Sequence, residues 1–514
     1  MIDEEVGFSD ITWSVWDEDN DEPKSRVCIV FTGGTIGMVP ENPNNPNIKK
    51  MKPAELEDLM KVVPELGKAD QIRLGMISFD DLVDSSDVTA RHWMAMANII
   101  DMYYQKFDGF VILHGTDTMA FTTSALSFML NNLAKPVVVT GSQLPITDPR
   151  TDAVQNLVSA VKIAGYKATG QPLIPEVSLC FRDHLLRGNR STKFSSSGFR
   201  GFMSPNFPAL GKLGEHIDID ENVILKPVNN EERKFFATKK LDKDIKVIPV
   251  NPNITPQQLE RDLKTKGIDG VILLTYGTGN MQTSPEFIEV IETAVKGGEG
   301  YAKPIPVLNV TQCSEGTVEM GLYEASSGLL EAGVSSGLDL TYEAALIKLN
   351  WALTRYKDIE EAKAQLQFSV RGEQSKNLHD IKWTKVEYHD SSDDKVILTN
   401  GKSIPGKYQS DRLNSAILRI QGMEIEPAND QAFEVRIFIN EPNADVDTPV
   451  QSAEFVKSIS DLEEISENSN LVCDASNTAK TVIDTGGTVS VTIVAIGAKV
   501  KCRSIFLSLY TDSH

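Results

Sequence analysis

The sequence predicts an α/β protein: two α/β domains built on parallel sheets, followed by a small all-β, sandwich-like domain. Three observations lead to this class. Short continuous apolar runs recur along the chain, each run ends in a loop rich in Gly, Thr, Ser or Asn, and helical patterns separate the runs. Continuous apolar runs are typical of strands buried on both faces of a parallel sheet. Their alternation with helices indicates the α/β class.

The first α/β domain is predicted over residues 25–235. Within it "RVCIVF" ends in the loop TGGT, "GFVIL" ends in HGTDT, and "KPVVV" ends in TGSQ. Segments such as "MAFTTSALSFMLNNL" supply the helical patterns between these runs. In open parallel sheets, ligands bind at the carboxyl ends of the strands. We therefore expect the polar loops to meet at one edge of the sheet and to form a binding site.

The rest of the chain is divided into domains where its composition and its helix and strand patterns change. A second α/β domain is predicted over 236–372, where "GVILL" and "PIPVLNV" each end in a polar loop. Residues 1–24 are predicted to be a solvated acidic leader, and residues 373–394 a linker. Over 395–514, runs such as "AFEVRIFIN" and "TVSVTIVAI" alternate in places, as half-buried antiparallel strands do. This β-rich segment predicts an accessory β-sandwich.

The composition argues against several kinds of partner. The formal net charge of −21 disfavours nucleic acid, because phosphate contact needs clustered Lys and Arg, and it disfavours an anionic membrane surface. No apolar run approaches the length of a membrane span, and the acidic N-terminus lacks the features of a signal peptide. A cytoplasmic location is therefore expected. The five cysteines form no CxxC pair and His is rare, so neither a disulfide framework nor a metal site is expected.

The tetrapeptide TGGT occurs twice, as Thr32–Thr35 and as Thr485–Thr488. The second copy lies between "KTVID" and "VSVTIVAI", two strand-like runs, and a Gly-Gly pair in that setting predicts a β-hairpin. The first copy follows a buried run of the parallel type. A tight glycine turn there lets backbone N–H groups face a ligand and places Thr35 at the mouth of a cleft.

A threonine hydroxyl is a poor nucleophile, so it needs a base nearby and donors for the oxyanion that forms. Because His is scarce, Lys193 is a candidate base if burial lowers its pKa. The loop HGTDT offers Thr116 and Asp117. The alternative roles are structural: the first TGGT as a plain turn, Asp117 or Thr118 as a helix cap, and Lys193 as a surface lysine.

A second polar cluster, "DSSD", places two hydroxyls between two carboxylates at residues 84–87. The hydroxyls of Ser85 and Ser86, with the flanking carboxylates, suit the α-amino and α-carboxylate groups of an amino acid. The alternative is that this cluster caps the helix expected to begin near Thr89.

Taken together, in this order and spacing, the motifs resemble the L-asparaginase family, in particular its bacterial cytoplasmic type I branch. The resemblance rests on TGGTIGM (32–38), DSSD (84–87), HGTDTM (114–119), TGSQLP (140–145), RGNRSTK (187–193), TQC (311–313) and DLTYEAALIKL (339–349). It covers roughly residues 25–375 and ends at VRGE (370–373). The β-rich segment is an addition to the family's core.

The resemblance implies hydrolysis of L-asparagine to L-aspartate and ammonia, without a metal or organic cofactor, by a homodimer or homotetramer. It implies that Thr35 is the nucleophile of a two-step acyl transfer, with Thr116, Asp117 and Lys193 as its catalytic partners. Ser85, Ser86 and Asp117 are implied to bind the substrate. Asn280 is expected to complete the site of a neighbouring subunit.

One departure from the family concerns its lid, which usually carries a Tyr soon after TGGTI. Here the lid is "VPENPNNPNIKKMKPAE", and no Tyr precedes Tyr103. Two alternatives to an asparaginase follow: a glutaminase-type amidohydrolase, or a catalytically weak scaffold whose β domain binds a partner. The missing Tyr favours a scaffold, whereas the complete set of Thr35, Thr116, Asp117 and Lys193 opposes it.

A second departure concerns the allosteric asparagine site that the resemblance implies for type I enzymes. Thr192 and Cys313 match two of its residues, but Thr275 stands where an Arg is usual. Without the guanidinium a carboxylate loses its fixed partner, so asparagine allostery is not expected. Cys313 is predicted instead to be a buried structural cysteine.

Overall fold

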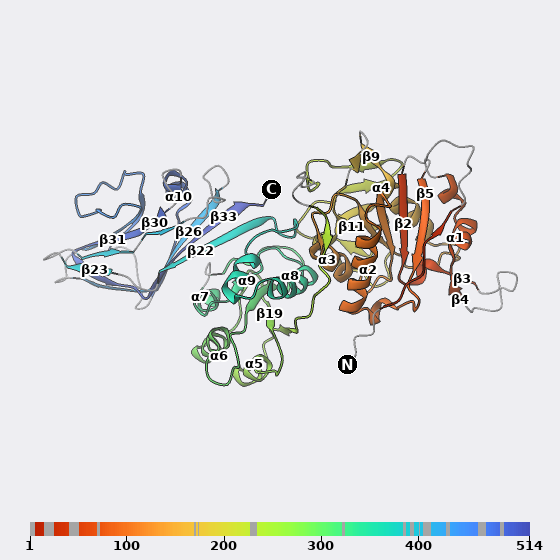
Figure 1. The fold of residues 1–514 in the computed structure, drawn as a ribbon. Coiled ribbons are helices and arrows are strands. Elements are labelled where there is room, and N and C mark those ends of the chain that lie inside the picture. The colour runs from red at the N-terminus through yellow and green to blue at the C-terminus, as the bar shows by residue number, and fades with distance from the viewer. Residues whose placement is uncertain are drawn as a thin grey trace.

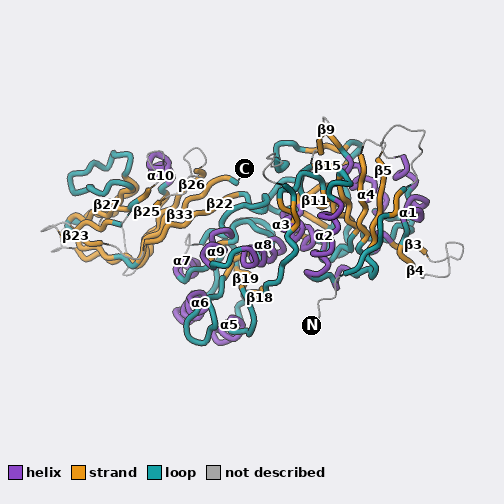
Figure 2. Tube along the Cα trace, viewed as in Figure 1, coloured by secondary structure: helices purple, strands orange, loops and turns teal. Residues whose placement is uncertain are grey.

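The computed structural model describes residues 6–14, 25–40, 51–68, 72–168, 171–172, 174–226, 234–320, 324–383, 387–390, 395–399, 401–403, 413–427, 432–460, 469–483 and 488–513. Its elements group into two α/β units and a C-terminal β unit (Figure 1). The strands of the β unit lie apart from the helix-flanked strands of the α/β units (Figure 2). The predicted α/β class and the added β-rich segment are therefore confirmed. The domain bounds at 235 and 372 stay predictions.

The first unit contains a nine-stranded sheet in the order β1-β5-β2-β6-β8-β11-β12-β15-β16. Its strands are β1 (Thr12–Trp13), β2 (Ser25–Phe31), β5 (Ile72–Ser78), β6 (Gly109–Leu113), β8 (Val137–Thr140), β11 (Val177–Phe181), β12 (His184–Arg187), β15 (Gly211–Leu213) and β16 (Ile217–Ile219). The five strands from β5 to β11 run parallel. Their carboxyl ends therefore share one edge, where the polar loops predicted for the site lie.

Helices cover both faces of this sheet. They are α1 (Leu56–Val62), α2 (Ala90–Tyr103), α3 (Met119–Met129) and α4 (Ala153–Gly165). Alternate residues of β2 point to opposite faces: Cys28 and Val30 join the apolar cluster of α2 and α3, whereas Val27 and Ile29 join that of α1 and α4. All four side chains are fully buried, which explains why the run "VCIVF" is continuously apolar.

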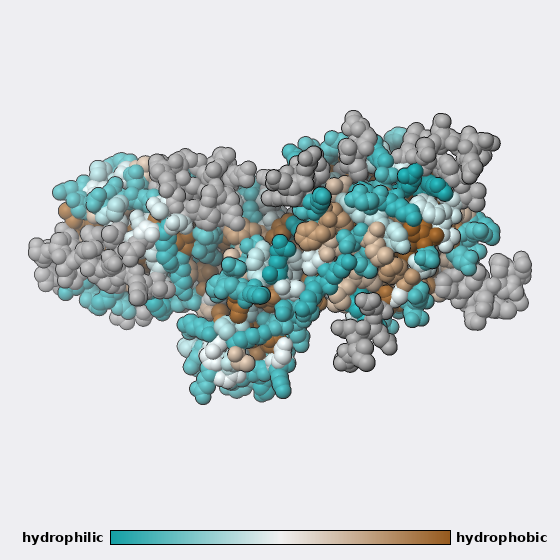
Figure 3. Space-filling view, viewed as in Figure 1, coloured by the Kyte–Doolittle hydropathy of each residue, from teal (hydrophilic) through white to brown (hydrophobic). Residues whose placement is uncertain are grey.

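The second unit is built on four parallel strands in the order β18-β19-β20-β21. The strands are β18 (Ile245–Pro249), β19 (Gly270–Thr275), β20 (Val307–Thr311) and β21 (Ser335–Ser336), and the helices are α5 (Pro256–Leu263), α6 (Pro285–Lys296), α7 (Glu324–Glu331), α8 (Tyr342–Arg355) and α9 (Ile359–Leu366). Hydrophilic residues cover much of the surface drawn over α5 and α6 (Figure 3). On the inner side, Trp351 of α8 packs on Phe128 of α3, with ring centroids 5.6 Å apart, so the two units share one apolar cluster.

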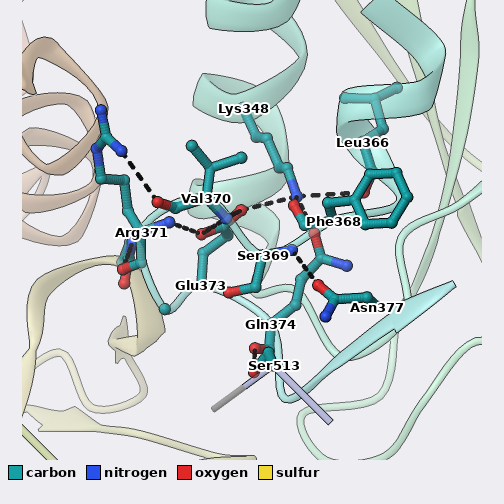
Figure 4. Close-up of polar contacts among 12 residues, drawn as sticks. Lys348, Leu366, Phe368, Ser369, Val370, Arg371, Glu373, Gln374, Asn377 and Ser513 are labelled. Carbon is teal, nitrogen blue, oxygen red and sulfur yellow. Dashed lines mark hydrogen bonds and ion pairs between the residues drawn. The ribbon is translucent and has the colours of Figure 1, made fainter. Parts of the chain in front are cut away.

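A buried ion pair holds the end of the second unit (Figure 4). The Nζ of Lys348 lies 2.7 Å from a carboxylate oxygen of Glu373, and both side chains are 0 % exposed. Lys348 also donates to the carbonyl of Phe368 and to the side chain of Gln374, and the carboxylate of Glu373 accepts the N–H groups that begin the VRGE segment. Each buried charge is thus met by several partners, as a charge in a protein interior must be.

Two arginines of the first unit hold the same VRGE segment. Arg190 donates to the carbonyl of Glu373 at 2.6 Å and to the carboxylate of Asp339 at 2.8 Å. Arg187 pairs with Glu176 at 2.6 Å and donates to the carbonyl of Gly372 at 3.3 Å. Both guanidinium groups are almost fully buried. The motif RGNRSTK therefore joins the first unit to the end of the second.

The C-terminal unit is a sandwich of two antiparallel sheets. One sheet contains β22 (Lys376–Trp383), β33 (Ser504–Asp512), β26 (Leu413–Pro427), β29 (Ser469–Asp474) and β32 (Ala498–Lys501). The other contains β23 (Glu387–Asp390), β24 (Lys395–Leu398), β31 (Val491–Ile496), β27 (Glu434–Ile439) and β28 (Phe455–Ser460). Apolar residues from both sheets, among them Leu507 and Ile493, form one core between them.

The prediction of a linker over residues 373–394 is wrong. This segment contains β22, which pairs with β33 over its whole length. Its many polar residues suggested a linker. However, Ile381 and Trp383 enter the sandwich core, whereas Lys382, between them, donates to the carbonyl of Glu331 in the second α/β unit. A strand covered on its second face by another domain can carry polar residues that the covering domain satisfies.

The leader was predicted to be solvated, but its described part is only partly exposed and packs on the first sheet. Strand β1 pairs antiparallel with β5 at the edge of the first sheet, and the ring of Trp13 stacks on Phe107 at 5.1 Å. Residues 1–5 and 15–24 lie outside the described residues.

Only part of the predicted C-terminal hairpin can be compared. Thr485, Gly486 and Gly487 lie outside the described residues, and Thr488 begins β30 (Thr488–Val489). The run "KTVID" is not a strand, because helix α10 (Ser476–Ile483) includes its first residues. A short β-branched run is compatible with both states, and here the helix packs against β26.

Within the described part of the chain, no helix is both long and apolar enough to cross a membrane.

Replacing Lys348 with Met should lower the free energy of unfolding by about 3–5 kcal/mol, because it leaves the buried carboxylate of Glu373 without its counter-charge. The matched control is Lys61→Met, which removes an exposed pair with Glu57 and should cost at most about 1 kcal/mol. Urea unfolding measures both variants. Equal effects would contradict the importance assigned to the buried pair.

Candidate functional site

The candidate site is built on the loops that follow β2 and β6. Thr32, the first residue of TGGT, donates through its hydroxyl to the carbonyl of Leu113 at 2.9 Å, so it ties the end of β2 to the end of β6. Gly33 and Gly34 follow with φ angles of 135° and 85°. These angles favour glycine. The chain then enters a short 3-10 turn, Thr35–Gly37, on which the side chain of Thr35 is exposed.

Three loops meet here because their glycines have no side chains. A Cβ added at Gly34 would lie 2.5 Å from the amide nitrogen of Gly115, in HGTDT. A Cβ added at Gly33 would lie 2.1 Å from the carbonyl oxygen of Val83, next to DSSD, and one added at Gly115 would lie 2.5 Å from the hydroxyl of Ser85. Gly33 and Gly34 therefore pack on backbone, and Gly115 packs on the side chain of Ser85.

The cluster DSSD is bound to HGTDT by hydrogen bonds. The buried hydroxyl of Ser85 accepts the N–H of Asp117 at 3.2 Å, and the carbonyl of Ser85 accepts the hydroxyl of Thr118 at 2.6 Å. The hydroxyl of Ser86 donates to Asp84 at 2.6 Å, and the hydrogen bonds from Ser86 hold the pKa of Asp84 below its usual value. Ser86 and Asp84 are exposed beside this contact, where a ligand can reach them.

The alternative role of DSSD was to cap the helix that begins near Thr89, and the structure shows a different cap. Helix α2 has Thr89 as its N-cap, in a capping box with His92, so DSSD does not cap that helix. Instead, Asp84 caps its own short 3-10 turn, Ser85–Asp87.

The amine of Lys193 contacts two of the other three predicted catalytic residues, Thr116 and Asp117. Its Nζ lies 2.9 Å from the hydroxyl oxygen of Thr116 and 2.7 Å from a carboxylate oxygen of Asp117. Lys193 lies on β13 (Thr192–Lys193), which pairs with β14 (Phe202–Met203). The Lys193 side chain is 16 % exposed and that of Asp117 is 64 % exposed, so the trio opens to solvent on the side of the carboxylate. Thr35 belongs to the adjoining loop, one residue beyond the contact of Gly34 with Gly115.

The histidine of the loop HGTDT holds this loop against helix α3. His114 is buried, and burial lowers its pKa to about 4, so its ring is neutral near pH 7. One ring nitrogen lies 2.6 Å from the carbonyl oxygen of Gly115 and the other lies 2.9 Å from the hydroxyl of Thr122 in α3. His114 therefore orients the loop and is not exposed to a substrate.

Sequence reasoning assigned no role to Glu343, although it lies in the quoted motif DLTYEAALIKL. Its carboxylate accepts the hydroxyl of Thr192 at 2.7 Å, and Thr192 directly precedes Lys193. Burial raises the pKa of Glu343, and its second oxygen has no hydrogen-bond partner among the described residues. The contact joins residues 151 apart in the chain, so only the fold shows it.

Three residues predicted from the resemblance lie in the second unit. Asn280 lies in the turn after β19, where its backbone bonds to Tyr276, and among the described residues it makes no hydrogen bond to the three loops. Thr275 is buried, and its hydroxyl donates to Asn309 at 2.6 Å. Cys313 is exposed, so the prediction of a buried structural cysteine is wrong.

Within the described residues, no group of three or more His, Cys, Asp or Glu side chains could hold a metal ion. Most of the segment predicted as a lid, residues 41–50, lies outside the described residues. The arrangement therefore offers hydroxyl, amine and carboxylate chemistry: two threonines as nucleophile or water ligand, a lysine that can exchange a proton, and a carboxylate that can bind a cation.

Gly34→Ala tests the packing of the loops. Gly267 is the matched control, because its φ of +92° resembles the +85° of Gly34 but nothing lies within 4 Å of an added Cβ. Gly267→Ala should lower the free energy of unfolding by about 1–2 kcal/mol through backbone strain alone. Gly34→Ala should lower it by roughly a further 1–3 kcal/mol through overpacking. Equal losses in urea unfolding would show that the loop contact is not tight.

Glu343→Gln tests the buried carboxyl. Because the pKa of Glu343 is raised in the folded protein, wild-type stability falls as pH rises from the unfolded pKa, about 4.3, through the folded pKa. Glutamine cannot ionise, so the variant should gain stability relative to the wild type across that window. Unfolding free energies measured between pH 4 and 8 check this. A constant difference would show that Glu343 does not titrate there.

The chain is similar to several known proteins. The chain is 37 % identical over 350 residues to "L-asparaginase 1" of Escherichia coli, covering 68 % of this chain and 98 % of that protein. It is 33 % identical over 377 residues to "60 kDa lysophospholipase" of Mus musculus, covering 70 % and 64 %. The crystal structure of L-asparaginase I from Vibrio cholerae matches with a TM-score of 0.59 and 39 % identity, covering 68 % and 99 %.

Two family models match the chain: "Asparaginase, N-terminal" over residues 26–225 and "Glutaminase/Asparaginase C-terminal domain" over 244–366. Both ranges end before β22. The matches span more than half of the sequence, and they agree with the resemblance to type I enzymes that the motifs indicated. The chain therefore belongs to the asparaginase family and is an enzyme of the amidohydrolase class.

Proposed function

We propose that the protein hydrolyses L-asparagine to L-aspartate and ammonia, with Thr35 as the nucleophile. The observation that carries the proposal is the contact of Lys193 with Thr116 and Asp117, in a loop that packs directly on the glycine preceding Thr35. Hydroxyls, an amine and a carboxylate at the carboxyl edge of a parallel sheet are what a two-step amide hydrolysis needs.

In the first step, the Thr35 oxygen attacks the carbon of the side-chain amide. The carbon–nitrogen bond breaks, and ammonia leaves with the proton that the hydroxyl gave up. Backbone N–H groups of the glycine turn and of Thr116 are suited to hold the oxyanion. This leaves an aspartyl ester on Thr35.

In the second step, water attacks the ester carbon, the bond to the Thr35 oxygen breaks, and aspartate is released. Thr116 and Lys193 hold that water, since the lysine amine and the threonine hydroxyl are 2.9 Å apart and can share its protons. Asp117 restrains the amine of Lys193 at 2.7 Å.

The substrate's charged ends suit the exposed groups of the loops. The carboxylate of Asp117 faces solvent and can bind the α-ammonium group, and the exposed hydroxyl of Ser86 can donate to the α-carboxylate. Ser85 supports these groups from within, because its hydroxyl accepts the N–H of Asp117. Asn280 lies outside this contact set and is proposed to act in the site of a second copy, in a homodimer or homotetramer located in the cytoplasm.

A second candidate activity is the cleavage of a lysophospholipid ester at the same threonine. The lysophospholipase relative favours it, and so does Phe194, which follows Lys193 directly and is 51 % exposed. An exposed ring beside the catalytic lysine could contact an acyl chain. The same threonine could attack an ester or an amide. The two activities therefore differ in which substrate binds.

Ammonia release from asparagine and glutamine, beside fatty-acid release from lysophosphatidylcholine, tests the proposal. Thr35→Ala should reduce asparagine turnover by at least roughly a thousandfold, because the variant lacks the nucleophile. The matched control is Thr488→Ala, in the second TGGT, which should leave turnover unchanged.

Each outcome of that assay has one meaning. Faster release from glutamine would indicate a glutaminase, and fatty-acid release without ammonia would indicate the lipid activity. A folded wild type without turnover of any of the three substrates would contradict the proposal and favour a scaffold. Equal loss in both threonine variants would remove the distinction between the two TGGT copies.

A further inference from the structure

The β unit docks on the second α/β unit through strands β22 and β33. Phe506 of β33 is 2 % exposed and belongs to the apolar cluster of the second unit. Beside it, Lys382 of β22 donates to the carbonyl of Glu331 in α7 at 3.2 Å, and its amine lies 4.9 Å from the centre of the Phe506 ring. Figure 1 shows β22 passing next to α7 and α9.

A hollow of about 590 Å³ opens at this junction. Four lysines line it: Lys382 from the β unit, and Lys296, Lys357 and Lys363 from the second α/β unit. Its volume is in the range of small-molecule sites. In a chain with a formal net charge of −21, such a group of cations is unusual.

The carboxylates that line the hollow are already engaged. Glu331 pairs with Arg503 at 2.8 Å, Glu360 pairs with Lys363 at 3.0 Å, and Asp358 accepts the N–H of Glu361 at 2.9 Å. Asp358 thereby caps its own helix. These carboxylates are not arranged to neutralise Lys382.

Among the described residues, Lys382 has no carboxylate within ion-pair distance, although its side chain is partly buried. Burial lowers its pKa, the nearby positive charges of Lys296 and Lys363 lower it further, and Glu331 and Glu292 oppose the shift. A partly buried ammonium group without a counter-charge is unfavourable, and an anion in the hollow would relieve it.

The start of helix α9 is not free to bind an anion. Asp358 caps it by accepting the N–H of Glu361, and Glu360 and Glu361 add negative charge to its first turn. The attraction for an anion therefore comes from the lysine amines, and lysine is a common ligand of phosphoryl groups.

We propose that this hollow, to which the β unit contributes Lys382, binds the phosphoryl group of a small dianion. The dianion is inorganic phosphate or a phosphate monoester. It contacts Lys382 of the β unit and Lys363 of the second α/β unit, and so it bridges the two units. The inference does not depend on the reaction proposed at Thr35.

Calorimetric titration of the full chain at constant ionic strength tests the inference, with inorganic phosphate, glycerol 3-phosphate and succinate as separate probes. Lys382→Met should weaken phosphate binding by roughly tenfold, since a hydrogen bond to a charged group is worth about 1.5–3 kcal/mol. Lys363→Met is the second variant, in case Lys382→Met does not fold. Lys499→Met, an exposed lysine of β32, is the matched control and should leave binding unchanged.

Tighter binding of glycerol 3-phosphate than of inorganic phosphate would indicate a monoester ligand, and the reverse order would indicate free phosphate. Either order, with loss in the Lys382 or Lys363 variant, supports the inference. Succinate binding as tightly as both phosphates would overturn it, because the hollow would then select charge alone. Absence of phosphate binding, or binding that both variants leave unchanged, would also overturn it.

Discussion

The close approach of three backbone loops at one edge of a parallel sheet is the constraint on which the candidate site depends. Gly34 packs on Gly115 and Gly115 packs on Ser85, at distances that leave no room for a Cβ. The strands that feed these loops are buried at most of their positions, so the loops have little freedom to separate. Thr35, Thr116 and Asp117 are therefore placed by packing, before any contact between their own side chains is considered.

Lys193, the proposed catalytic lysine, is positioned from the opposite direction. Lys193 ends the motif RGNRSTK, whose two arginines are buried and hold the VRGE segment at the end of the second unit. The ion pair of Lys348 with Glu373 holds that segment from the other side. Buried ion pairs are weak sources of net stability, but breaking one is costly, so together they fix one relative placement of the two α/β units. The same segment leads into β22, so the clamp also fixes where the β unit begins.

Much of the first unit could be predicted, because its determinants are local. The run "RVCIVF" is apolar at every position that the sheet buries, and the glycines of TGGT and HGTDT mark turns whose backbone contacts could be expected from their neighbours. The contact of Lys193 with Thr116 was expected only through the family resemblance, since 77 residues separate the two. Glu343 was missed for a similar reason: its partner, Thr192, lies in another unit of the chain.

The errors occurred where local sequence patterns do not determine the environment of a residue. The polar segment 373–394 appeared unable to form a strand, yet it contains β22. There Lys382 finds a carbonyl in the second α/β unit and the ring of Phe506 on the neighbouring strand β33. The run "KTVID" has the composition of a strand but packs as part of a helix on β26. Cys313 appeared apolar enough to be buried, but it is exposed. Local patterns do not contain these long-range contacts.

The central claim is that the first TGGT carries the nucleophile, and covalent trapping tests it most directly. The protein would be incubated with an asparagine analogue whose side-chain amide is replaced by a diazo ketone, and intact mass and peptide mapping would locate the adduct. Our account expects one adduct per chain, on Thr35, and none in Thr35→Ala. An adduct on Thr116 or on another residue, with Thr35 unmodified, would contradict it.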